Sequence, residues 1–73
     1  MSNLKTYSGK KLISVLKKLG FTVIRIKGSH HYLKHQDGRA TVVPVHSNED
    51  IGIGLLLKIL RDIEITKEEF EKL

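Results

Sequence analysis

The chain has 73 residues, of which 40% are hydrophobic and 29% are charged, and it contains no cysteine. This length allows a single domain, residues 1–73, of ordinary globular composition. The lack of cysteine excludes a disulfide framework and a thiolate metal cluster, and it fits a reducing cytosol. No apolar run approaches the roughly 20 residues needed to cross a bilayer, and the first eleven residues lack an apolar signal segment. We therefore expect a cytoplasmic protein without a membrane partner.

The charge is divided unevenly along the chain. Residues 1–46 carry nine basic side chains and one acidic side chain, a net charge of +8, whereas residues 47–73 carry four basic and seven acidic ones, a net charge of −3. This pattern predicts that the first part meets a polyanion such as nucleic acid. A solvated basic surface without a partner is the alternative. The acidic tail either caps the fold or keeps the polyanion on the basic side.

The first predicted element is an amphipathic helix over residues 10–19, whose apolar side chains recur at helical spacing. Ser8 is a suitable N-cap, and Gly20 follows the expected C-terminus. Three strands then follow over residues 21–27, 30–35 and 39–45, separated by turn-forming glycines. Pro44 cannot donate a hydrogen bond to a neighbouring strand, so it requires a sheet edge or the end of a strand.

A second amphipathic helix is predicted over residues 53–63. Its apolar stripe comprises Ile53, Leu56, Leu57 and Leu60, widened by Ile59 and Ile63. Residues 66–69 form a capping box that begins a short helix at Lys67. The predicted class is therefore α+β in the order α-β-β-β-α, as in double-stranded-RNA-binding domains. The three-stranded antiparallel sheet carries two helices on one face, the other face is open, and a short C-terminal helix follows.

Alternation along the second strand divides its side chains between the two faces of the sheet. His30, Tyr32 and Lys34 share one face, and His31, Leu33 and His35 share the other. We expect a nucleic acid to bind the face without helices, where Tyr32 stacks on a base and Lys34 meets a phosphate. Packing in the core is the alternative for Tyr32. His31 and His35 are interpreted as structural or simply exposed.

Several short motifs occur together in this chain. They are Gly28-Ser29-His30-His31-Tyr32 at the start of the second strand, Leu19-Gly20-Phe21, Thr41-Val42-Val43-Pro44 and Ile53-Gly54-Leu55. In this order and length, the sequence resembles the HicA (YcfA-like) family of toxin endoribonucleases. The resemblance implies an mRNA interferase, the toxin of a type II toxin–antitoxin pair, with His30 as its catalytic residue. It also implies a HicB-type antitoxin that occludes His30. We expect no cofactor, and a monomer when the toxin is free.

The residues themselves support acid–base chemistry on RNA. Metal-independent cleavage needs a base for the 2′-hydroxyl proton and an acid for the leaving oxygen, and histidine suits both roles because its pKa lies near neutrality. Gly28, beside Ser29, lets the backbone approach a phosphate closely. The cations expected to meet the RNA are Arg25, Lys27 and Lys34 near the motif, with Lys10 and Lys11 attracting RNA less specifically.

Other interpretations of the same residues remain open. The four histidines lack metal-ligand spacing, and His30 and His31 face opposite ways, so no metal site is predicted. A non-catalytic RNA-binding module would use the same sheet and basic surface. A degenerate toxin that acts only by binding a partner is the third possibility, and toxicity on expression would separate it from an active enzyme.

Overall fold

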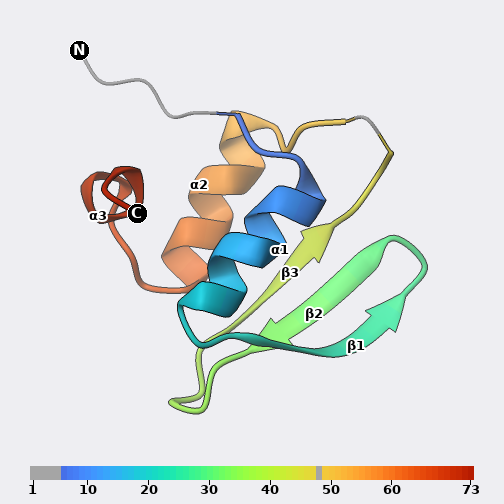
Figure 1. Ribbon diagram of the computed structural model, residues 1–73, viewed down its shortest axis with the longest axis horizontal. Coiled ribbons are helices and arrows are strands. Elements are labelled where there is room, and N and C mark those ends of the chain that lie inside the picture. Colours follow the sequence, from blue (N-terminus) through green and yellow to red (C-terminus); the bar gives the residue numbers. More distant parts are fainter. Residues whose placement is uncertain (1–5, 48) are drawn as a thin grey trace.

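The computed structural model describes residues 6–47 and 49–73. The elements follow the predicted order, and Figure 1 labels them along the chain. They are α1 (Gly9–Lys18), β1 (Thr22–Lys27), β2 (His30–Lys34), β3 (Ala40–Pro44), α2 (Ile53–Asp62) and α3 (Lys67–Glu71). Within the described part of the chain, no helix has the length and apolar character needed to cross a membrane.

The helices begin and end within one residue of the predicted positions. The Ser8 hydroxyl accepts a hydrogen bond from the Lys11 backbone N–H at 3.1 Å, which caps α1. Gly20 has a φ of 98°, the left-handed conformation that ends many helices after their last turn. The predicted capping box also forms, because Thr66 and Glu69 exchange side-chain-to-backbone hydrogen bonds at the start of α3.

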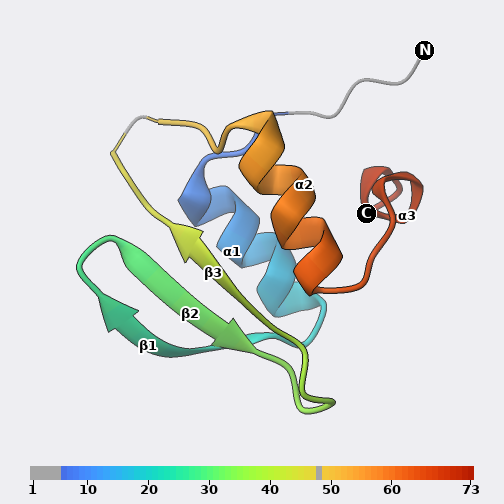
Figure 2. The ribbon, with the colours of Figure 1, turned by 180° about the vertical axis from the view of Figure 1, so that it is seen from behind.

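The three strands form an antiparallel sheet in the order β1-β2-β3, as predicted. Both α1 and α2 make their main sheet contacts with β3, and Figure 2 shows them from behind. Leu33 and Val43 point toward the helices and are buried in the core with Leu12, Leu16 and the inner side of α2. Pro44 ends β3 at an edge of the sheet, where its missing N–H breaks no ladder.

The predicted apolar stripe of α2 is wrong in part. Leu56, Ile59, Leu60 and Ile63 are buried, but Ile53 and Leu57 are 58% and 41% exposed. Compared with the predicted orientation, α2 is turned about its axis so that its buried stripe begins at Leu56. Leu57 then lies beside the segment that leads to α3. The chain therefore has an apolar surface at α2 that periodicity alone assigns to the core.

A β-bulge in β1 changes which of its residues share a face. Val23 is paired with Leu33, but Arg25, two residues later, is already paired with Tyr32, so Ile24 is the extra residue. A bulge shifts the alternation by one position. As a result Arg25 and Lys27 lie on the same face as Tyr32 and His30, while Ile26 lies on the helix side opposite His31.

Candidate functional site

Five of the predicted site residues lie together on the face of the sheet that carries no helix, which we call the open face. In register across the strands, Lys27 lies opposite His30 and Arg25 lies opposite Tyr32, and Lys34 continues the row along β2. The Arg25 guanidinium lies 5.9 Å from the centroid of the Tyr32 ring, a cation–π contact. Tyr32 is only half-buried and is not part of the core, so the stacking interpretation fits its position better than core packing does.

The remaining predicted residues lie elsewhere. Gly28 and Ser29 form the β1–β2 turn, and Gly28 has a φ of 59° with open space around it. Lys10 and Lys11 are on α1, across the sheet from the open face. Lys11 lies over the Tyr7 ring at 5.8 Å and not beside His30. The structure therefore places Lys10 on a second surface, away from the five residues of the open face, and places Lys11 on neither surface.

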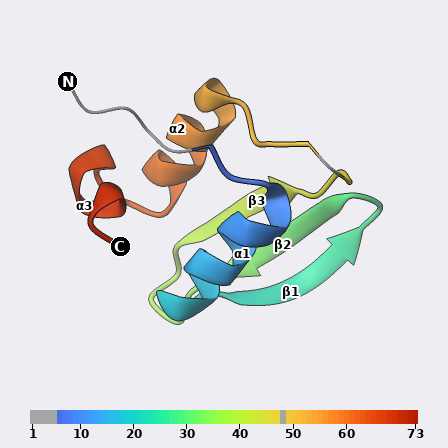
Figure 3. The same ribbon diagram turned by 45° about the horizontal axis from the view of Figure 1, so that its top comes forward.

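The second surface is a hollow between α1 and the β1–β2 hairpin, with a volume of about 450 Å³, which we call the α1 groove. Figure 3 shows the hairpin extending past α1. The groove is lined by Lys10, Ile13, Ser14, Lys17, Val23, Ile26, His31 and Val45. Four of these follow the i, i+3, i+4, i+7 pattern of one helix face, so a single stripe of α1 forms one wall. This volume lies within the range of about 300–1,000 Å³ found for small-ligand sites.

His31 has the most defined surroundings of the two adjacent histidines. Its ring is half-buried, and its Nδ1 lies 3.3 Å from the Ser29 carbonyl oxygen. A carbonyl can only accept, so in the neutral ring this hydrogen bond places the proton on Nδ1 and leaves the lone pair on Nε2. The same carbonyl accepts the Val45 backbone N–H at 2.8 Å, which holds the turn against the end of β3. The first bond orients the imidazole ring, and the second fixes the carbonyl that the ring meets.

His30 is exposed and lies on the open face between Lys27 and Pro44. Across residues 6–47 and 49–73 its ring makes no hydrogen bond or ion pair. From the sequence, His31 is interpreted as structural or exposed, because the face without helices is expected to bind the nucleic acid. The structure places His31 in the lining of the α1 groove, on the helix side of the sheet.

His35 belongs to a structural cluster at the other end of β2. Its Nδ1 accepts the Asp37 backbone N–H at 3.1 Å, and its ring packs edge-on against Phe21. Asp37 in turn accepts the backbone N–H of Arg39, which is the main cause that holds the pKa of the Asp37 carboxyl below its ordinary value. Arg39 also donates to the Ile63 carbonyl at 2.5 Å, so the cluster fixes the β2–β3 turn to the end of α2. This arrangement holds the β2–β3 turn in place.

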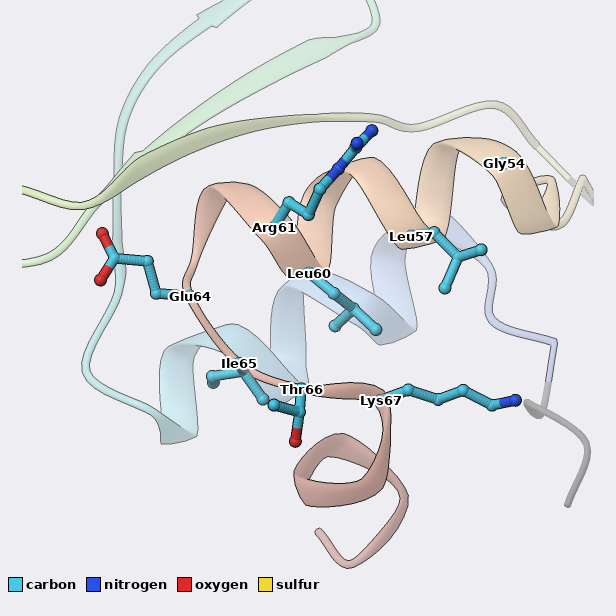
Figure 4. Close-up of a pocket in the computed structure, with 8 residues that line it drawn as sticks. All are labelled: Gly54, Leu57, Leu60, Arg61, Glu64, Ile65, Thr66 and Lys67. Carbon is cyan, nitrogen blue, oxygen red and sulfur yellow. The ribbon is translucent and has the colours of Figure 1, made fainter.

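Another hollow, of about 680 Å³, lies between α2 and the segment before α3. Figure 4 shows its lining, with Leu57 and Leu60 on α2, Ile65 on the segment that leads to α3 and Lys67 at the start of α3. Its charged lining residues are Arg61, Glu64 and Lys67, and no histidine lines it. In the part of the chain that the structure describes, no three histidine, aspartate or glutamate side chains come close enough to hold a metal ion.

The sequence matches the model of a known protein family. Residues 9–65 match the family model described as the HicA toxin of bacterial toxin–antitoxin, which covers more than half of the chain. The chain belongs to the HicA toxin family. No curated protein gives a significant match. The matched range of this HicA chain runs from the first residue of α1 to just before α3, so it contains both the open face and the α1 groove. The protein is therefore the toxin of a toxin–antitoxin pair.

Proposed function

We propose that this HicA protein is a metal-independent endoribonuclease that cleaves mRNA by acid–base catalysis, with His31 as the catalytic imidazole. The observation that carries the proposal is the setting of the His31 ring, held by the Ser29 carbonyl and lining a groove that also contains Lys10 and Lys17. Membership of a toxin family supports an activity that harms its own cell, and the basic first half of the chain supports RNA as the target.

The chemistry follows from the free Nε2 of His31. Acting as a base, Nε2 takes the proton of a ribose 2′-hydroxyl, and the resulting oxygen attacks the adjacent phosphorus. The bond from phosphorus to the 5′-oxygen breaks, and that oxygen takes a proton from the His31 imidazolium, which returns the ring to its neutral form; the products are a 2′,3′-cyclic phosphate and a 5′-hydroxyl. Lys10 and Lys17 offset the negative charge that builds on the phosphate. Acid–base catalysis of this kind contributes roughly 10²–10⁴-fold to a rate.

His30 remains the residue that the sequence predicts for this role. Because neighbouring strand residues face opposite sides, His30 and His31 do not act on one phosphodiester together. His30 has Lys27 and Arg25 on its face to attract a phosphate, but among residues 6–47 and 49–73 its ring finds no hydrogen-bond partner that would orient it. The proposal therefore places catalysis in the α1 groove and gives the open face a supporting role in binding RNA.

The experiment compares wild type, His30→Ala and His31→Ala with a structured mRNA in the presence of EDTA. We expect cleavage by wild type and by His30→Ala, and a loss of at least about 100-fold in His31→Ala. The opposite pattern would assign catalysis to His30 and the open face. Thermal denaturation of both variants controls for folding, because both replaced side chains have exposed surface.

A non-catalytic RNA-binding module is the second candidate function. The contact of Arg25 with Tyr32 on the open face favours it, because an aromatic ring among cations is typical of sheets that bind RNA by stacking. RNA binding without cleavage by the wild-type protein would support this function.

As the partner that neutralises the toxin we propose a HicB-type antitoxin that covers the site. Expression of the toxin alone should therefore arrest growth, and co-expression of the antitoxin should restore growth.

A further inference from the structure

We infer that the α1 groove binds an unpaired nucleotide of RNA, with Ile26 against its base and with Lys10 and Lys17 at the flanking phosphates. This inference rests on RNA being the substrate, as proposed above. Beyond the proposed function, it specifies that the bound RNA is unpaired, and it names the side chains outside the histidine pair that select this state.

The first observation is an apolar side chain that the fold leaves uncovered. Ile26 lies on the helix side of the sheet, paired with His31, yet 59% of it is exposed. On the same side, Leu33 and Val43 are almost fully buried. The bulge at Ile24 is what turns Ile26 toward α1, and its side chain lines the groove together with Val23 and Ile13. The floor of the groove is therefore apolar and open.

The second observation is the position of the cations around this floor. Lys10 and Lys17 are separated by seven residues, which is about 10.5 Å along a helix axis. Ile13 and Ser14 lie between them on the same stripe of α1. The Ser14 hydroxyl donates to the Lys10 carbonyl at 3.3 Å, so it is already engaged with the helix backbone. The wall thus presents one cation at each end, with Ser14 and the largely buried Ile13 between them, and the exposed apolar surface of the groove comes from Ile26.

This combination fits a single strand better than a duplex. Proteins contact double-stranded RNA mainly through phosphates and 2′-hydroxyls across its shallow groove, because its bases are stacked and paired. An apolar floor has no partner on such a surface. An unpaired nucleotide exposes a base face that can cover Ile26, and its phosphates can meet the lysines, which is the pattern of single-strand binding sites. His31 lies at the same floor, within the groove that would hold the ribose.

The test measures binding separately from cleavage, using a fluorescent 2′-fluoro RNA oligonucleotide that lacks the 2′-hydroxyl nucleophile. Anisotropy titrations compare the single strand with the same strand annealed to its complement. Ile26→Ser is compared with Ile24→Ser, a matched control because Ile24 is equally exposed, at 61%, on the same strand. Lys10→Gln and Lys17→Gln are compared with Lys18→Gln, an exposed lysine on α1 outside the groove.

We expect Ile26→Ser to weaken single-strand binding by roughly three- to tenfold while Ile24→Ser changes it little. Lys10→Gln and Lys17→Gln should reduce both the affinity and its dependence on salt, more than Lys18→Gln does. Equal or tighter binding of the duplex would overturn the inference. So would wild-type affinity in all three groove variants, the result expected if an acidic protein partner occupies the groove and RNA does not.

The outcomes separate this inference from the proposed function. If wild type cleaves RNA but the groove variants bind the single strand normally, the groove assignment is wrong and the nuclease assignment stands. If the groove variants lose binding as expected but wild type does not cleave, the groove assignment stands and the nuclease assignment is wrong.

Discussion

Because α1 lies close to the end of β3, we predict that glycine-to-alanine substitutions at Gly9 and at Gly54 have opposite effects on stability. A Cβ added at Gly9, the first residue of α1, would overlap the Pro44 carbonyl oxygen and lie 3.1 Å from the Val45 Cα. These atoms are backbone and cannot rotate away, so Gly9→Ala forces α1 from the sheet. Overpacking of this kind costs about 1–3 kcal/mol, which outweighs the gain of about 0.5–1 kcal/mol from replacing a helical glycine.

Gly54→Ala is the matched control, because Gly54 lies in the first turn of α2 with no heavy atom within 4 Å of the added Cβ. It should stabilise the protein by up to about 1 kcal/mol. In a domain of this size 1 kcal/mol shifts Tm by roughly 4–8 °C, so a thermal melt distinguishes the two variants. Equal shifts, or a Gly9→Ala protein as stable as wild type, would refute the close approach of α1 to β3.

Three further predictions concern the C-terminal helix and the β2–β3 turn. Phe70→Ala should lower the free energy of unfolding in urea by about 3 kcal/mol or more, because the ring is 1% exposed; a loss below 1 kcal/mol would mean that α3 does not complete the core. Thr66→Ala should cost about 0.5–2 kcal/mol through loss of the capping box, whereas Thr22→Ala on an exposed part of β1 should cost less. Asp37 has its pKa held below the ordinary value in the folded state, mainly by the Arg39 backbone N–H, so its stabilising effect is complete above the ordinary pKa and is lost as the pH falls through the folded-state pKa. Urea titrations from about pH 5 downward should therefore show a shallower loss of stability in Asp37→Asn than in wild type, and identical curves would contradict this cause.

Local sequence signals predict most of the fold because each is decided within a few residues. Ser8 and Gly20 bound α1, and the Thr66 capping box starts α3, through hydrogen bonds and backbone conformations that involve only neighbouring residues. The strand order also follows from short turns, since a turn such as Gly28-Ser29 leaves the chain no room to cross over. These features were confirmed by the structure.

The site was predicted less completely because it depends on how the elements pack. No distinctive residue in the sequence indicates the bulge at Ile24, yet this bulge determines which face of the sheet Arg25 and Ile26 occupy. Likewise, periodicity places His31 on the helix side but does not say that α1 leaves this part of the sheet uncovered. The α1 groove results from both features. Its position between the hairpin and the stripe of α1 that carries Lys10 and Lys17 follows only from how these elements pack.

The most direct test of the central claim is to analyse the ends of the RNA fragments made by the wild-type protein in EDTA. An imidazole acting on a 2′-hydroxyl predicts a 2′,3′-cyclic phosphate on one fragment and a 5′-hydroxyl on the other, and no cut where the attacking nucleotide is 2′-deoxy. Fragments with a 5′-phosphate, or cleavage that continues at the 2′-deoxy position, would contradict the account.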